Sequence, residues 1–202
     1  MRRPLLALLI VAGALAVPAD AARRSTSAVV SEIMTRAIED FIQPGYQRFH
    51  LASGELTNEV EALCTGPSEQ GLEDARGAFS KTAVAWSHIE IVRFGPVAGE
   101  NRYERILYYP DRRGVGLKQV QRLINGFEPY PQTLAELQGK SVALQGLPAL
   151  EYALFGTGAE TLASEENSDR CHYAELIAKN IESIARELDR AWSDPEGVSR
   201  LW

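Results

Sequence analysis

The chain has 202 residues, of which 45% are hydrophobic and 24% are charged, and its formal net charge is −6. This length is enough for one full hydrophobic core or for two small ones. A moderately acidic chain without clusters of Lys and Arg is not expected to bind nucleic acid or an anionic membrane surface.

The first 21 residues are typical of a secretory signal peptide. Two arginines precede an apolar run over 5–17, which is too short to span a bilayer comfortably, and residues 19–21 fit the small-x-small pattern of a cleavage site. We therefore expect a signal peptide over 1–21, a domain over 22–202, and export to the periplasm. An uncleaved anchor helix is the alternative. We expect no transmembrane segment after signal cleavage, because no second apolar run of that length follows.

The remaining sequence predicts an all-α protein, built as an up-down helical bundle. Apolar residues recur at helical spacing, and alternating β-branched runs are almost absent. Pro44-Gly45 is expected to end or kink the first helix. An irregular connection over 96–116 is long for such a protein, and long ordered loops are often functional. The predicted helices cover Ser31–Gln43, Tyr46–Leu63, Glu69–Arg93, Leu117–Asn125, Leu134–Leu144, a short segment within 146–156, and Asp169–Trp192.

The short helix within 146–156 is the clearest candidate for a functional site. Pro148 suits a first helical turn, where a missing N–H has no consequence, and Gly156 offers a left-handed stop. Glu151 is the single charge between them. A lone carboxylate among apolar residues is expected either to form an ion pair or to take part in the protein's function.

A second carboxylate, Glu90, repeats this arrangement. Each of Glu90 and Glu151 follows an apolar residue and precedes Phe-Gly by one turn. Facing carboxylates in a helical bundle can hold a metal, so the pair is a candidate site for iron or another divalent metal. Alternatively, the two glutamates clamp Arg93 in a structural ion pair, or the match arises by chance.

Other candidate residues lie in the long connection and at the histidines. Tyr109 and Asp111 are expected near the site, although Asp111 could simply cap its own turn. His172 and Glu175 share a helical face, but a solvated surface histidine is the better interpretation. The sequence has no HExxH, GxSxG or phosphate-binding glycine motif.

The chain has two cysteines, Cys64 and Cys171. In an exported protein an even number of cysteines favours a disulfide, here one that closes a long loop. The competing interpretation is a thiolate metal site, which the wide spacing and the lack of a CxxC motif disfavour.

Several short segments, taken in their order along the chain, resemble the imelysin family. The resemblance rests on Arg93-Phe94-Gly95-Pro96, Tyr109-Pro110-Asp111, Gln145 to Glu151, and Arg170-Cys171, and it covers nearly all of the chain after the signal. Imelysins are bacterial envelope proteins similar to the insulin-cleaving membrane protease and to the imelysin-like part of some ferrous-iron uptake systems. The resemblance implies a fold of two helical-bundle halves. This chain would hold the first half and lack much of the second.

The hallmark of that family is GxHxxE, proposed to bind metal or to act in peptidolysis. Gly146 and Glu151 match its ends, but Pro148 stands at the histidine position. We therefore expect a non-catalytic periplasmic binding protein, linked to metal acquisition and to envelope iron-uptake components. Glu90 and Glu151 would line the site, and Arg93 could instead hold an anionic ligand. The alternatives are a zinc metallopeptidase with Glu151 as general base, or an envelope interaction module with a buried Glu90–Arg93–Glu151 network.

Overall fold

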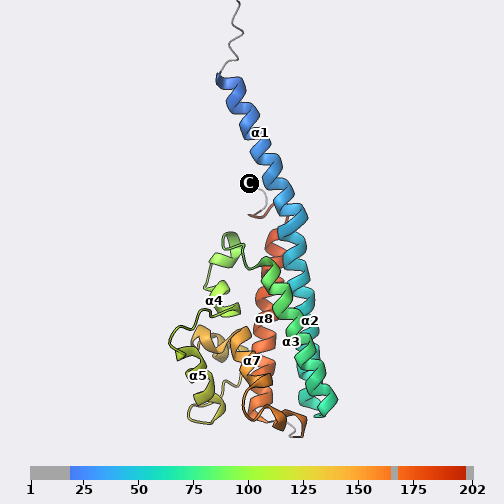
Figure 1. The fold of residues 1–202 in the computed structure, drawn as a ribbon, viewed down its shortest axis with the longest axis vertical. Coiled ribbons are helices and arrows are strands. Elements are labelled where there is room, and N and C mark those ends of the chain that lie inside the picture. Colours follow the sequence, from blue (N-terminus) through green and yellow to red (C-terminus); the bar gives the residue numbers. More distant parts are fainter. Residues whose placement is uncertain (1–18, 165–167, 199–202) are drawn as a thin grey trace, which may run out of the picture.

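The computed structural model describes residues 19–164 and 168–198, and these residues form helices and connecting turns without a β-strand (Figure 1). Most of the predicted signal peptide, and the last four residues of the chain, lie outside the described part. None of the described helices is both long and apolar enough to cross a membrane. The α-helices are α1 Ala19–Ala37, α2 Gln43–Thr65, α3 Glu69–Ile89, α4 Arg102–Ile106, α5 Val115–Ile124, α6 Leu134–Gln138, α7 Leu147–Phe155 and α8 Asp169–Ser193.

Helices α1 and α2 form one long rod, and α1 projects beyond the rest of the molecule (Figure 1). The helix expected to end or kink at Pro44-Gly45 does not end there, because the chain stays helical through both residues. A π-helical segment, Ile38–Ile42, comes directly before the proline. Proline has no N–H and its ring crowds the carbonyl one turn earlier, and the wider π turn accommodates both effects. Gly45 lets α2 pack tightly, since a Cβ there would lie 2.6 Å from Cδ1 of Ile89.

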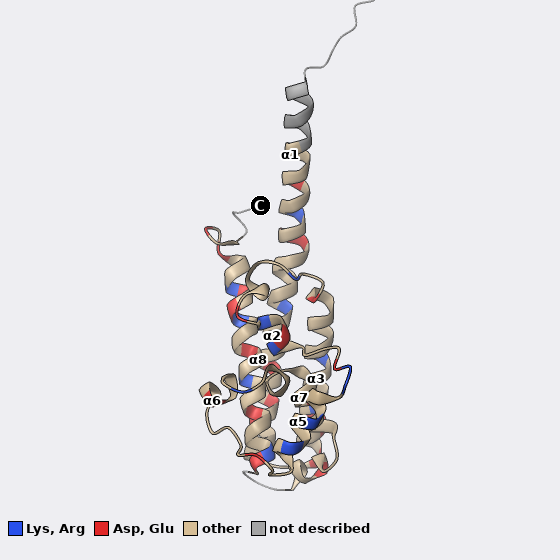
Figure 2. Ribbon diagram, turned by 90° about the vertical axis from the view of Figure 1, so that its left-hand side faces the viewer, with Lys and Arg blue, Asp and Glu red and all other residues tan. Residues whose placement is uncertain are grey.

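Helices α3 and α8 both pack against α2, and these three helices hold most of the core. The apolar stripe predicted for the last helix is fully buried. The buried Thr82 hydroxyl on α3 donates to the carbonyl of Ala52 on α2, which leaves no unpaired hydroxyl at this contact. Figure 2 shows acidic and basic residues mixed along α8. The stripe consists of Tyr173, Ile177, Ile181, Ile184, Leu188 and Trp192.

Helix α3 ends one turn earlier than predicted. Ser68 caps its start by accepting from the N–H of Gly71 at 3.0 Å, and its last helical residue is Ile89. The N–H of Val92 then bonds to the carbonyl of Ile89 in a turn, and Gly95 adopts a φ of 69°. Arg93 therefore lies beyond the helix and does not share the apolar stripe of α3.

The shorter helices α4 to α7 form a layer against α3 and α8 (Figure 1). The connection expected to be irregular contains a 3-10 turn, Gly95–Ala98, and then α4. The helix expected over Leu134–Leu144 ends at Gln138, and a separate 3-10 turn, Val142–Leu144, follows. Ser68 and Ser168 cap α3 and α8 in the same way.

Cys64 and Cys171 form a disulfide, as predicted, with their Cα atoms 5.6 Å apart. The bond joins the end of α2 to the first turn of α8. Both sulfurs are used in the disulfide, so the thiolate metal site is excluded.

Candidate ligand-binding groove around helix α7

Gly146 sets the position of α7. A Cβ at this residue would lie 2.5 Å from the carbonyl oxygen of Arg105 and still closer to that of Ile106. Only glycine allows this approach, so α7 begins directly against the end of α4. The helix buries Leu147, Ala149, Leu150, Ala153 and Leu154, and it directs Pro148, Glu151, Tyr152 and Phe155 towards the other side.

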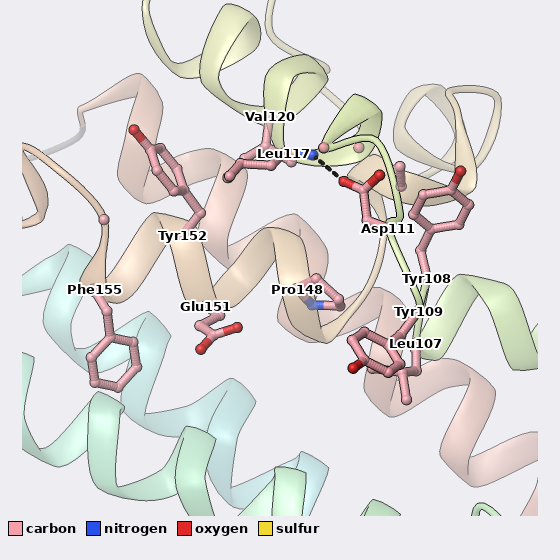
Figure 3. A pocket seen from close by; sticks show the side chains of 14 residues that line it. Leu107, Tyr108, Tyr109, Asp111, Leu117, Val120, Pro148, Glu151, Tyr152 and Phe155 are labelled. Atoms are coloured by element: carbon pink, nitrogen blue, oxygen red, sulfur yellow. Dashed lines mark hydrogen bonds between the residues drawn. The ribbon is translucent and has the colours of Figure 1, made fainter.

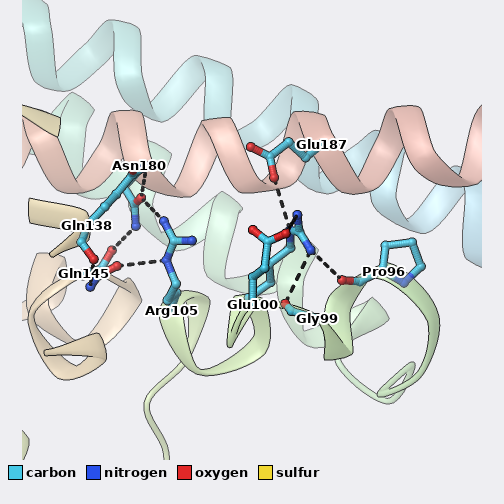
Figure 4. A network of polar contacts seen from close by, with 9 residues as sticks. Pro96, Gly99, Glu100, Arg105, Gln138, Gln145, Asn180 and Glu187 are labelled. Carbon is cyan, nitrogen blue, oxygen red and sulfur yellow. Dashed lines mark hydrogen bonds and ion pairs between the residues drawn. The ribbon is translucent and has the colours of Figure 1, made fainter. Parts of the chain in front are cut away.

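A half-buried polar network fixes the start of α7 (Figure 4). Arg105 donates to the side-chain oxygen of Gln145 at 2.9 Å and to that of Asn180 at 3.0 Å. The Asn180 amide in turn donates to the backbone carbonyl of Gln145 at 3.0 Å. Burial lowers the pKa of Arg105, and both of these acceptors are neutral oxygens. The network therefore ties α7 to both α4 and α8.

The other end of α7 is held by Arg170. Its guanidinium donates to the carbonyls of Tyr152, Ala153, Gly156 and Thr157 at 2.8–3.2 Å. A cation is favoured at a helix C-terminus, although burial lowers the pKa of this arginine. The left-handed stop expected at Gly156 is wrong, since its φ is −72°. Glycine is needed there because a Cβ would lie 2.5 Å from the carbonyl oxygen of Tyr152.

Replacing Arg170 with Lys should lower the free energy of unfolding by about 2 kcal/mol, because an ammonium cannot reach four carbonyls in the planar arrangement of a guanidinium. Urea denaturation measures this loss. Arg190→Lys is the control, since Arg190 is exposed on the same helix, and it should change stability by less than about 0.5 kcal/mol. Equal effects of the two changes would contradict the assigned role.

The main cavity, of about 540 Å³, lies between α7, α5 and the segment that leads into α5 (Figure 3). Four residues singled out from the sequence line it: Tyr109, Asp111, Pro148 and Glu151. The other walls come from side chains that the sequence analysis did not assign to the site, chiefly Leu107, Tyr108, Leu117, Val120, Tyr152 and Phe155.

A smaller cavity of about 220 Å³ contains the predicted carboxylate pair. Glu90, directly after α3, and Glu151, on α7, both line it, with Trp86 and Pro148. Glu90 is half-buried and Glu151 is exposed. Neither side-chain carboxylate makes a hydrogen bond or an ion pair with another described residue. Glu151 and Pro148 line both cavities, so the two cavities meet at the exposed face of α7.

Arg93 is not part of a carboxylate network. Its guanidinium donates to the hydroxyl of Tyr103 at 2.8 Å and lies 4.7 Å from the centroid of that ring. Because α3 ends at Ile89, Arg93 turns to α4, where it lines a third cavity, of about 360 Å³, together with Tyr109. Arg93 and Glu151 are both exposed, so the buried Glu90–Arg93–Glu151 network is not formed.

The Asp111 side chain makes local hydrogen bonds in the turn that leads into α5. Its two carboxylate oxygens accept from the N–H groups of Val115 and Leu117 at 2.8 and 3.0 Å. Figure 3 shows the bond to Leu117. The carboxylate thus caps the start of α5, which is the turn role weighed from the sequence. Tyr109, by contrast, is 74% exposed at the edge of the main cavity.

The histidines lie away from these cavities. His50 bonds to Asp189 at 2.9 Å, and Nε2 of His172 lies 3.2 Å from the carbonyl oxygen of Gln132. Over the described ranges, no three side chains of His, Cys, Asp and Glu come together in a group that could hold a metal.

The spacing of the residues on α7 predicts one wall of the groove, by which we mean the main cavity together with the smaller cavity that shares Glu151 and Pro148 with it. Pro148, Glu151, Tyr152 and Phe155 follow the i, i+3, i+4, i+7 pattern of one helical face. Of this set, only Glu151 and Pro148 were predicted from the sequence to belong to the site. Tyr103, the partner of Arg93, had no comparable signal.

The fold and groove define an all-helical protein with a ligand-sized cavity, lined by aromatic side chains, beside a carboxylate that pairs with no described residue. The chain belongs to the imelysin family, whose sequence model, described as imelysin, matches residues 42–202. It is also similar to the crystal structure of an imelysin-like protein from Psychrobacter arcticum 273-4, with 26% identity and a TM-score of 0.70. That match covers 80% of this chain and 49% of the other, so this chain spans about half its length. Among curated proteins, none matches the sequence.

Proposed function

We propose that this chain is a non-catalytic binding protein of the periplasm that takes part in the acquisition of iron or another divalent metal, with envelope iron-uptake components as partners. The observation that carries the proposal is the shared cavity of Glu90 and Glu151, two residues from elements far apart in the sequence. The similarity to an imelysin-like protein supports it at the level of the family.

The two carboxylates suit a hard cation. Iron and calcium take oxygen ligands, and neither carboxylate is committed to an ion pair in the described structure. Because the described residues supply no third charged ligand, the bound ion would keep water molecules or the ligands of its carrier. A site with so few protein ligands favours reversible binding of the metal ion over tight storage.

Pro148 weighs against peptidolysis. It lines both cavities beside Glu151, so a histidine at this position would face the same space as the carboxylate. Proline offers no lone pair to a metal, and the family motif GxHxxE is therefore incomplete. Binding is the function that the remaining residues support better than catalysis.

Calorimetric titration of the full chain with ferrous, ferric and zinc ions tests the proposal. We expect one of these ions to bind, and Glu90→Gln and Glu151→Gln each to weaken binding about tenfold, equivalent to about 1.4 kcal/mol. Glu104→Gln is the control, because Glu104 lines only the cavity of Arg93 and should not change the affinity. Absence of metal binding would contradict the proposal. Zinc-dependent peptide cleavage that is lost in Glu151→Gln would support the metallopeptidase instead.

A further inference from the structure

We propose that the main cavity binds a hydrophobic organic cation, that is, an amine or guanidine with an apolar body. This inference does not rest on the proposed metal site. The two sites share Glu151, but the walls of the main cavity come from α5, α7 and the segment before α5, and Glu90 does not line it.

The size of the cavity fits a small organic molecule. Its volume of about 540 Å³ lies within the range of ligand pockets in proteins and far exceeds the needs of a bare metal ion. Leu117 and Val120 from α5 face Tyr152 across it, and Leu107 closes the far end near Pro148 (Figure 3). An apolar body can therefore be enclosed between the two helices.

The acidic residues that line the cavity favour a ligand with a positive charge. Of the described residues that line it, two are acidic and none is Lys, Arg or His. The Asp111 carboxylate is occupied by two backbone N–H groups, whereas the Glu151 carboxylate accepts no hydrogen bond from a described residue. An anionic ligand would meet this carboxylate without a compensating donor, but an ammonium or guanidinium would pair with it.

The aromatic rings add to this preference. Tyr108, Tyr109, Tyr152 and Phe155 all line the cavity, and the faces of such rings attract cations. Arg76 and Arg170 lie 5.2 and 6.0 Å from the rings of Phe155 and Tyr152, yet neither lines the cavity. Both arginines donate to carbonyls of α7, so they do not supply a charge for an anionic ligand.

Three probes with the same apolar body and different charge test the inference: phenylbutylamine, phenylbutanol and phenylbutyrate. Titrated into the full chain in metal-free buffer, the amine should bind most tightly and the acid most weakly, with a difference of about tenfold. Glu151→Gln should reduce that difference to within about twofold, since it removes the paired charge. Leu117→Trp, which fills the cavity from an exposed position on α5, should weaken all three probes.

Glu90→Gln separates the two sites. It should weaken metal binding about tenfold and leave the order of the three probes unchanged, because Glu90 lies outside the main cavity. The inference is overturned if the acid binds as tightly as the amine, if the preference for the amine survives Glu151→Gln, or if no probe binds at millimolar concentration.

Discussion

Replacing both Cys64 and Cys171 with alanine should lower the free energy of unfolding by about 4 kcal/mol. The two residues are 107 positions apart, so the disulfide closes most of the chain into one loop. A cross-link over such a loop removes many conformations from the unfolded chain, and its loss restores them. The bond also joins the end of α2 to the start of α8, two helices of the central bundle.

Urea denaturation of the variant and of the unmodified chain, each with and without reductant, measures this effect. The unmodified chain in reductant should approach the stability of the variant, and the variant should not respond to reductant. A loss below about 1 kcal/mol would contradict the prediction, since it would mean that the unfolded chain is constrained in another way.

Gly146→Ala should lower the free energy of unfolding by about 3 kcal/mol, the upper part of the range for overpacked sites. The new methyl group would meet two backbone carbonyl oxygens of α4, at Arg105 and Ile106, and backbone atoms cannot rotate away as a side chain would. The start of α7 must then move, and with it the groove. We therefore expect weaker binding of metal and amine probes as well as a lower melting temperature.

Gly54→Ala is the matched control. Gly54 lies inside α2, and a Cβ there would meet no atom within 4 Å. Alanine is the better helix former, so this change should raise the free energy of unfolding by about 0.5–1 kcal/mol. The prediction for Gly146 fails if both changes shift stability in the same direction.

Much of the fold could be predicted from local pattern. The stripe from Tyr173 to Trp192 recurs at helical spacing, and periodicity alone identifies the buried face of α8. The end of α3 could not be predicted in this way. Its pattern runs on to Glu90 and Arg93, but the turn after Ile89 and the contact of Arg93 with Tyr103 depend on where α4 packs. Tertiary contacts of this kind leave no periodic signal.

The candidate site was predictable to a similar extent. The repeat of Glu before Phe-Gly pointed to Glu90 and Glu151, which do line one cavity. It did not indicate that Gly95 has a positive φ while Gly156 does not. Gly95 begins a 3-10 turn, whereas Gly156 packs against Tyr152. The role of Asp111 follows from a local rule for turns, whereas its place on the cavity wall depends on how α5 packs.

The disulfide and the clamp on α7 occupy adjacent positions. Cys171 is bonded to α2, and Arg170, the residue before it, holds four carbonyls at the end of α7. The covalent bond thus anchors the turn from which the arginine reaches the groove. We expect the disulfide to help pre-organise the main cavity, so reduction of the bond should weaken the binding of the proposed ligands even though neither cysteine lines that cavity.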